Sequence, residues 1–286
     1  MKIVETVAEV REQVKAWRKE GLTVGLVPTM GYLHEGHQSL IAKACAQNDR
    51  VVVSVFVNPT QFGPNEDLES YPRDLEHDAA LCESTGAALI FHPTPEEMYP
   101  KGFCSFVDMD VLTKELCGLS RPVHFRGVCT VVSKLLHIVQ PDKAYFGEKD
   151  AQQLAVIRRM VLDLNMNVEI VGCPIVRESD GLAKSSRNTY LSPAERKAAL
   201  VLSKSIFAGK QLAEAGETDA AKLVQAMTKI IEAEPLAKID YVKVVDLMTM
   251  QQIPKLDRPF LAAIAVYIGK TRVIDNFMMQ AGGTAE

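Results

Sequence analysis

The stretch "LTVGLVPTMGYLHEGHQSLIAKACAQN", residues 22–48, decides the fold. It begins with an apolar run at 22–28 that is typical of a buried strand and ends in proline. A short loop follows, and the apolar residues after it recur at helical spacing. A strand, a turn and a helix in this order are the first half of a βαβ unit, which predicts a parallel sheet.

The same alternation continues to about residue 175. A capping box of Thr6 and Glu9 predicts a first helix that ends at Gly21. The run "VVVSVFV" (51–57) is typical of a strand covered on both faces. Further strands are expected at 87–91, 143–147 and 167–172, helices at 73–85, 128–139 and 150–164, and a strand or an excursion at 103–111. The pattern predicts an α/β fold: a Rossmann-like, doubly wound parallel sheet with right-handed crossovers.

The pattern changes beyond about residue 177. Two helices are expected at 192–214 and 218–233, and three apolar runs follow at 239–246, 260–269 and 271–279. Helices followed by consecutive strands favour a smaller α+β domain with an antiparallel sheet. We therefore predict two domains, 1–176 and 177–286.

Composition limits the class of protein. The 286 residues are 47% hydrophobic and 24% charged, which is ordinary for a soluble globular protein. The net charge of -4 argues against broad binding of nucleic acid. No apolar run approaches the roughly 18 residues of a membrane span, and the N-terminus becomes polar too early for a signal peptide. Six scattered cysteines without a Cys-x-x-Cys pair indicate reduced, mostly packing thiols in a cytoplasmic protein.

His34 and His37 raise three alternatives: a metal site, a phosphate site or simple packing. The metalloprotease pattern needs histidines at i and i+4, whereas these lie at i and i+3 without a third ligand nearby. They stand between a strand and the start of a helix, where unpaired amides and the helix dipole favour an anion. Gly31 allows a tight turn and Gly36 a close approach of phosphate to the backbone. We predict that both imidazoles donate hydrogen bonds to phosphate oxygens.

Two more clusters indicate the same chemistry. The first follows a short strand and contains Gly147, Glu148, Lys149 and Asp150. Its lysine could neutralise phosphate, and its aspartate could hold a ribose hydroxyl or Mg²⁺. The second combines two cations with two hydroxyls in Lys184, Ser185, Ser186 and Arg187, a combination suited to clamping a triphosphate. Each cluster alone fits a capped helix or a solvated loop, but three at strand ends or at the domain junction favour a phosphate site.

Six motifs in order carry a family resemblance: "PTMGYLHEGHQSL", "FVNPTQF", "YPRD", "HFRGVCTVVSKL", "FGEKDAQQL" and "DGLAKSSRNTYLS". Together they resemble the pantothenate synthetase (pantoate–β-alanine ligase) family. The likeness runs to about residue 200 and continues more weakly through "VIDNFM". The His-x-Gly-His element alone marks all nucleotidylyltransferase-like folds, so the specificity lies in the combination.

The resemblance implies a reaction and a set of site residues. The family adenylates (R)-pantoate with Mg-ATP, and β-alanine then attacks the acyl adenylate to give pantothenate and AMP. His37 and His34 would be catalytic, and Gln61 and Gln153 would bind pantoate, with Gln61 also contacting β-alanine. The residues implied at ATP are Met30, Gly31, Tyr32, Leu33, His34, Glu35, Gly36, His37, Gly147, Glu148, Lys149, Asp150, Val176, Lys184, Ser185, Ser186 and Arg187. Mg²⁺ would be carried by ATP without a protein metal cage, the protein would be a homodimer, and residues 177–286 would act as a lid.

Some positions keep open interpretations. Lys184 departs from the methionine or leucine of many members, so its role is not transferred from them. Arg121, His124 and Arg126 could help to hold anions, and Tyr71 could line the pantoate pocket or pack beside Pro72.

Three rival functions are weighed against this one. Another adenylyltransferase of the same superfamily would need a basic pocket where Gln61 and Gln153 stand. A class I aminoacyl-tRNA synthetase would need a longer chain and an anticodon-binding region. A non-catalytic nucleotide-binding regulator would be expected to lose the histidines, glutamines or cations, all of which are present.

Overall fold

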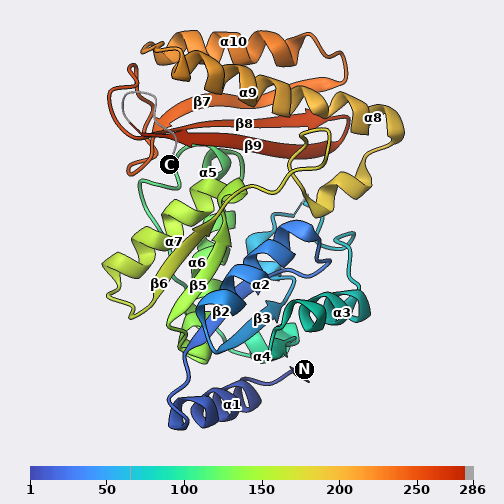
Figure 1. Ribbon diagram of the computed structural model, residues 1–286, viewed down its shortest axis with the longest axis vertical. Coiled ribbons are helices and arrows are strands. Elements are labelled where there is room, and N and C mark those ends of the chain that lie inside the picture. Colours follow the sequence, from blue (N-terminus) through green and yellow to red (C-terminus); the bar gives the residue numbers. More distant parts are fainter. Residues whose placement is uncertain (65, 281–286) are drawn as a thin grey trace. The chain divides into compact units, whose positions relative to one another are not determined.

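A six-stranded parallel sheet organises the part of the chain before residue 175. The computed structural model describes residues 1–64 and 66–280. The strands are β1 (Lys2–Val4), β2 (Val24–Thr29), β3 (Arg50–Val55), β4 (Leu89–Phe91), β5 (Lys143–Gly147) and β6 (Glu169–Cys173). Their order is β1-β4-β3-β2-β5-β6, so the chain reverses direction across the sheet between β2 and β5 (Figure 1). This reversal is the topological switch point at which open α/β sheets bind ligands.

Helices cover both faces of this sheet, as the doubly wound prediction requires. The longer ones are α1 (Val7–Lys19), α2 (Glu35–Gln47), α3 (Leu75–Thr85), α6 (His124–Val139) and α7 (Ala151–Asp163). The stretch 59–150 also contains the short helices α4 (Pro95–Met98) and α5 (Cys117–Ser120) and the 3-10 turns η1 (Pro59–Gln61) and η2 (Glu148–Asp150). Helix α2 packs on α3 and on the sheet, and α1 packs on α6. Ile41, Ala44, Val53 and Ile90 lie in the core beneath α2.

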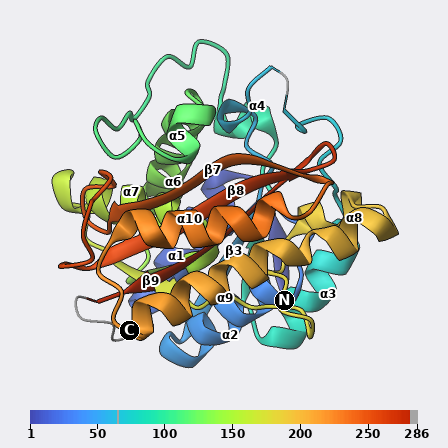
Figure 2. The same cartoon turned by 90° about the horizontal axis from the view of Figure 1, so that it is seen from above.

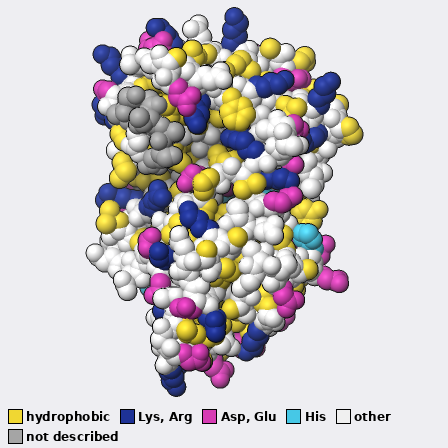
Figure 3. All heavy atoms as spheres, viewed as in Figure 1, with side chains coloured by type: hydrophobic (Ala, Val, Ile, Leu, Met, Phe, Trp, Pro, Cys, Tyr) yellow, Lys and Arg dark blue, Asp and Glu magenta, His cyan; other side chains and the backbone are white. Residues whose placement is uncertain are grey.

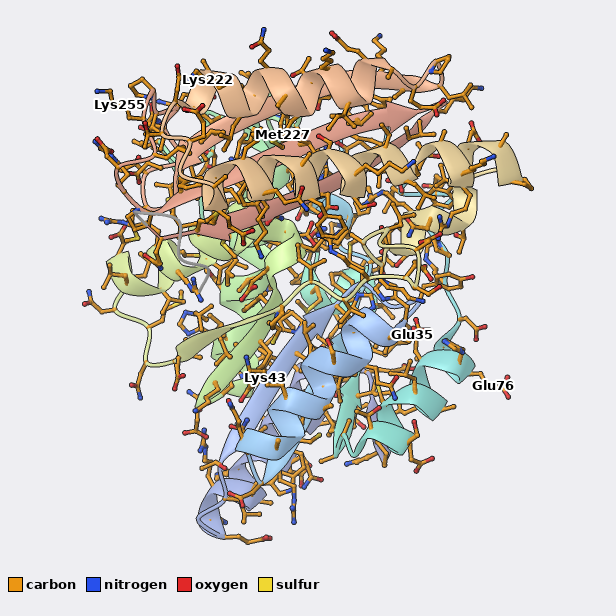
Figure 4. All side chains as sticks on the ribbon, turned by 45° about the horizontal axis from the view of Figure 1, so that its top comes forward. Glu35, Lys43, Glu76, Lys222, Met227 and Lys255 are labelled. Atoms are coloured by element: carbon orange, nitrogen blue, oxygen red, sulfur yellow. The ribbon has the colours of Figure 1, made fainter. Side chains whose placement is uncertain are left out.

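A three-stranded antiparallel sheet lies in the part of the chain after residue 175. Its strands are β7 (Ala237–Asp246), β8 (Phe260–Ile268) and β9 (Thr271–Met279), in the order β7-β8-β9. Helices α9 (Leu200–Glu214) and α10 (Ala220–Glu232) lie side by side across this sheet (Figure 2). Gly209 on α9 makes room for Met227 on α10, because a Cβ at Gly209 would stand 2.6 Å from the Met227 sulfur (Figure 4).

The described chain divides into two compact units. The N-terminal unit contains Met1–Met109, Arg121–Glu148 and Val156–Pro174. The C-terminal unit contains Asp110–Ser120, Lys149–Ala155 and the described residues from Ile175 onward. Two short segments that precede residue 175, 110–120 and 149–155, thus belong to the same unit as the residues after it. The domain limits 1–176 and 177–286 stay a prediction.

Several local expectations are corrected. Helix α6 begins at His124, about one turn before the predicted residue 128. The helix expected at 192–214 is interrupted at Ala199, which separates α8 (Pro193–Ala198) from α9. A strand or an excursion was expected at 103–111. Residues 103–109 form no strand, so the structure shows the excursion. The three-residue β1 was not predicted, because it is too short to show a period.

Three of the six cysteines, Cys82, Cys129 and Cys173, are buried. Burial raises the pKa of the Cys82 and Cys129 thiols to about 12, which keeps them protonated at neutral pH. Cys173 is also buried, and desolvation raises its pKa as well. These thiols agree with the predicted packing role.

The surface shows no broad basic face in the view of Figure 3. Acidic, basic and hydrophobic side chains alternate over the visible face of each unit. Within the described residues, no helix is both long and apolar enough to span a membrane.

Candidate active site

The loop after β2 leads into α2 at the switch point of the sheet. Gly31 lies in the left-handed region at φ +83°, and a Cβ there would come within 3.0 Å of both Asp78 and Val55. The turn therefore requires glycine at this position. Tyr32 is also left-handed, at φ +51°, which is uncommon for a residue with a side chain. The loop is consequently held in a shape that its own backbone does not prefer.

His34 and His37 cap the start of α2. The Gly36 N–H donates to His34 Nδ1 at 3.1 Å, and the His34 N–H donates to His37 Nδ1 at 3.3 Å. The two ring centroids are 4.1 Å apart, so the imidazoles lie side by side at the helix start. Because each Nδ1 accepts a hydrogen bond, each neutral ring carries its proton on Nε2. Each neutral ring therefore has its N–H donor at Nε2.

Helix α3 supports this loop from behind. Asp78 is 1% exposed and accepts from the Tyr32 N–H at 2.9 Å and the Leu33 N–H at 2.6 Å. His77 Nε2 lies 3.0 Å from the Leu33 carbonyl oxygen. Burial raises the pKa of the Asp78 carboxyl, and the hydrogen bonds from Leu33 and Tyr32 offset this only in part. The Leu33 side chain is also buried in the core, so Leu33 supports the loop rather than facing solvent.

Helix α2 begins beside these groups. Glu35 is exposed at its first turn, and Lys43 lies two turns further along (Figure 4). Lys43 Nζ donates to the Gly172 carbonyl on β6 at 3.0 Å, which ties the helix to the sheet.

Gln61 lies against the same loop. Its Nε2 is 3.0 Å from the Met30 sulfur, and its Oε1 accepts from Asn58 Nδ2 at 3.0 Å. Asn58 is 1% exposed, and its Oδ1 accepts from the Tyr99 hydroxyl at 2.7 Å. The structure therefore joins "FVNPTQF" to "PTMGYLHEGH" and orients the Gln61 amide through a buried network.

Helix α6 packs closely against the backbone at Gln61, and a glycine, Gly127, stands at the contact. A Cβ at Gly127 would lie 2.4 Å from the Thr60 carbonyl oxygen and 2.5 Å from Gln61 Cα. The Gln61 carbonyl oxygen in turn lies 3.1 Å from His124 Nδ1 and accepts from Arg121 Nη2 at 3.5 Å. Gly127 is thus required for the approach that places Gln61.

The two arginines considered for anion binding, and Tyr71, have other contacts. Arg121 forms a two-point ion pair with Glu66, at 2.8 Å from Nε and 2.5 Å from Nη2. Arg126 lies over the Phe106 ring at 4.0 Å. The Tyr71 ring packs edge-on against Phe62, with 6% of the residue exposed. These contacts give the three side chains roles in holding the loops around Gln61.

The segment after β5 carries the second cluster. A Cβ at Gly147 would meet nothing within 4 Å, so open space lies beside the strand end. In the C-terminal unit, Lys149 is partly buried and Asp150 is exposed. Gln153 is partly buried, whereas its neighbour Gln152 is 5% exposed. Gln152 accepts from the Cys117 N–H at 2.9 Å, which anchors the first turn of α7 to the segment 110–120.

Residues 176–184 form a short hairpin in the C-terminal unit. The Lys184 N–H donates to the Val176 carbonyl at 2.9 Å, and Arg177 pairs with Ala183. The Lys184 ammonium lies 3.0 Å from Glu178. The hairpin leads into η3 (Ser186–Tyr190), where the Ser185 side chain accepts from the Arg187 N–H at 3.3 Å. Val176 and the cluster Lys184–Arg187 therefore sit at the two ends of one hairpin.

Sequence reasoning missed the residues that hold these groups in place. They are Asn58, His77, Asp78, Tyr99, Gly127, Gln152, Arg177, Asp275 and Asn276. Asn58 stands inside "FVNPTQF" and Asn276 inside "VIDNFM", so polar residues within apolar runs were the available signal. Asp78 carried no such signal, because an acid near the start of a helix is ordinary.

A doubly wound sheet with a His-x-Gly-His element at its switch point is typical of the nucleotidyl-transferring class. A sequence model of the family described as Pantoate-beta-alanine ligase matches residues 2–278. The chain belongs to this family. The match confirms the resemblance drawn from the motifs, and it makes the protein an ATP-dependent ligase.

Individual relatives agree with the family. The pantothenate synthetase of Ruminiclostridium cellulolyticum is 68% identical over 277 residues, covering 97% of this chain and 98% of that protein. The crystal structure of pantothenate synthetase from Thermus thermophilus is 47% identical with a TM-score of 0.91, over 97% of this chain and 99% of that one. The Francisella tularensis pantoate-beta-alanine ligase, described as complexed with beta-gamma ATP and beta-alanine, is 35% identical with a TM-score of 0.80, over 97% of each chain.

Proposed function

We propose that this protein condenses (R)-pantoate with β-alanine, using ATP, to give pantothenate, AMP and pyrophosphate. A pantoate carboxylate oxygen attacks the α-phosphorus, and the bond from that phosphorus to the pyrophosphate oxygen breaks. The β-alanine amine then attacks the acyl carbon, the bond to AMP breaks, and the amine loses a proton. The first step is needed because a carboxylate is a poor acylating agent until its oxygen is part of a phosphate leaving group.

The arrangement of His34 and His37 carries this proposal. Both rings hold an Nε2–H donor at the start of α2, where the amides and the helix dipole also favour negative charge. Pyrophosphate gains charge as it departs, so these donors act most strongly in the transition state. Transfer of a nucleotidyl group to a carboxylate needs no proton to move at this step, so we assign both residues to charge stabilisation.

We propose that Gln61 and Gln153 bind pantoate, with Gln61 also near β-alanine. An amide both donates and accepts, which suits a substrate with hydroxyls and a carboxylate. Gln61→Ala and Gln153→Ala should raise the KM for pantoate and spare that for ATP. An unchanged KM for pantoate would refute this assignment.

We propose that Lys149, Lys184 and Arg187 bind the phosphates, with the Val176 backbone near the adenine. One exposed carboxylate, Asp150, stands beside Lys149, and the described residues contain no group of three or more metal-binding side chains. These residues would fit a Mg²⁺ that enters on the phosphate oxygens of ATP, and Asp150 is the side chain that could help to hold it. Bound there, Mg²⁺ would neutralise phosphate charge.

The experiment that tests the function is ATP–pyrophosphate exchange. Exchange that requires pantoate and proceeds without β-alanine supports an acyl adenylate intermediate. Exchange that instead requires a phosphorylated acceptor would support the rival adenylyltransferase, and binding of ATP without exchange would support a regulator.

We further propose a cytoplasmic homodimer in which residues 177–286 act as a lid. The scattered free cysteines support the cytoplasmic assignment. The family resemblance supports the dimer and the lid. Sedimentation would measure the oligomeric state, and solution scattering with ATP and pantoate should show compaction if the lid closes.

A further inference from the structure

Two adjacent residues of β9 hold both proposed ATP-binding segments of the C-terminal unit. Strand β9 is an edge strand of its sheet, and η3 packs against it. Asp275 and Asn276 are only 2% and 4% exposed, and consecutive strand residues point to opposite faces. This pair can therefore bind two different segments at once.

Asp275 anchors the hairpin 176–184. Its two carboxylate oxygens accept from Arg177 at 2.7 and 2.9 Å, the geometry of a two-point pair. Arg177 also donates to the Gly181 carbonyl at 3.1 Å, and its guanidinium lies 5.0 Å over the Phe207 ring. One arginine thus ties the base of the hairpin, its turn and β9 together.

Asn276 anchors the turn at Lys149. Its Nδ2 donates to the Lys149 carbonyl oxygen at 2.9 Å, and its own N–H donates to the Asp275 carboxylate at 2.8 Å. The contact is to the backbone of Lys149, so it directs where the lysine side chain leaves the chain without occupying its ammonium.

We propose that Asp275 and Asn276 are positioning residues that fix the spacing between Lys149 and the hairpin that ends at Lys184. The inference rests on the proposed function, because it needs both segments to bind ATP. Both segments must bind the same triphosphate, and its short length limits how far apart they can lie, so their spacing affects binding. A displacement of about 1 Å at a reacting centre can lower the rate by on the order of a hundredfold.

A double-mutant cycle tests the role of Asn276. Asn276→Ala should lower kcat/KM for ATP by on the order of tenfold, mostly through KM, and leave KM for β-alanine unchanged. In a Lys149→Ala background the same change should have no further effect on kcat/KM for ATP. Its effect on Tm should be equal in both backgrounds, because Lys149→Ala keeps the carbonyl that Asn276 binds. A purely structural role would instead give the same fold loss of activity in both backgrounds, which overturns the inference.

Three further measurements complete the test. Asn276→Leu keeps a side chain of similar size and removes the donor without adding a charge beside Asp275, so it should reproduce the activity loss if the alanine variant folds poorly. Met278→Leu, two residues along the same face of β9, serves as the matched control and should retain wild-type activity. Wild-type protein without pantoate-dependent exchange would refute the proposed function and this inference together. Active wild type, with Lys149→Ala impaired and Asn276→Leu unimpaired, would refute this inference alone.

Discussion

The loop Met30–His37 and the hairpin 176–184 both supply proposed ATP contacts, but they are held in different ways. The loop is capped by contacts two and three residues apart in the chain, from His34 to Gly36 and from His37 to His34. Its more distant support, Asp78, is 45 and 46 residues away. The hairpin is held by Asp275, which is 98 residues from Arg177. Because the caps of the loop are local, its conformation can be predicted from sequence. The hairpin instead depends on the folding of the whole C-terminal unit.

The largest effect is expected when Asp275, the distant support of the hairpin 176–184, is removed. Asp275→Ala leaves the Arg177 guanidinium, 19% exposed, without its partner. Removing one member of a buried ion pair costs about 3–5 kcal/mol, because the other charge is left unpaired. Urea denaturation should therefore show a large loss of stability. Asp257→Ala removes an exposed pair with Arg258 and should leave the unfolding midpoint unchanged; an equal loss in both variants would contradict the distinction.

The next effect concerns the local loop and appears in rate rather than stability. His37→Ala should lower kcat by about a hundredfold to a thousandfold, with little change in the KM for ATP, because a donor to developing charge is lost. His34→Asn keeps a capping acceptor for α2 and removes the Nε2–H donor, so it separates catalysis from capping. Rapid-quench formation of pantoyl adenylate is the measurement. His137→Ala, an exposed change on α6, is the control, and adenylate formation by His37→Ala at the wild-type rate would exclude the role.

The same contrast explains how far sequence predicts this protein. The strands β2 and β3, the capping box at Thr6 and the β7–β9 sheet follow from local periods and caps, which need no tertiary information. The histidines and both glutamines lie in motifs that mark them as candidates. Asp78, Gly127 and Asn276 act through backbone atoms of distant segments, and sequence spacing contains no record of such contacts. The sequence therefore indicates which residues could carry the chemistry, but not which distant segments contact one another.

A smaller effect is expected where α3 supports the loop, and it depends on pH. Burial raises the pKa of the Asp78 carboxyl, so its stabilising contribution is complete below the ordinary aspartate value of about 3.9. That contribution is lost as the pH rises through the raised folded pKa. Asp78→Asn does not titrate, so the stability difference between wild type and variant should shrink across this window and be constant above it. We expect about 1 kcal/mol to persist at pH 7, because one loop N–H loses its acceptor.

Thermal unfolding of both proteins from pH 3 to 7 would measure this difference. Glu76→Gln lies on the same helix with an exposed side chain and provides the matched control (Figure 4). A difference that widens with rising pH would show that the carboxylate is stabilised by its two amide donors more than it is penalised by burial.

The smallest effect tests whether the hairpin holds Lys184 for ATP or only for itself. The Lys184–Glu178 pair is partly exposed, 19% and 29% at the two side chains, so it contributes at most about 1 kcal/mol. If Glu178 competes with phosphate for the ammonium, Glu178→Gln should lower the KM for ATP about twofold at low salt and less at high salt. Glu214→Gln removes an exposed pair with Lys210 and should not change that KM. A higher KM in Glu178→Gln would mean that Glu178 aims Lys184 at the ligand, and the hairpin would then resemble the loop in carrying its own local support.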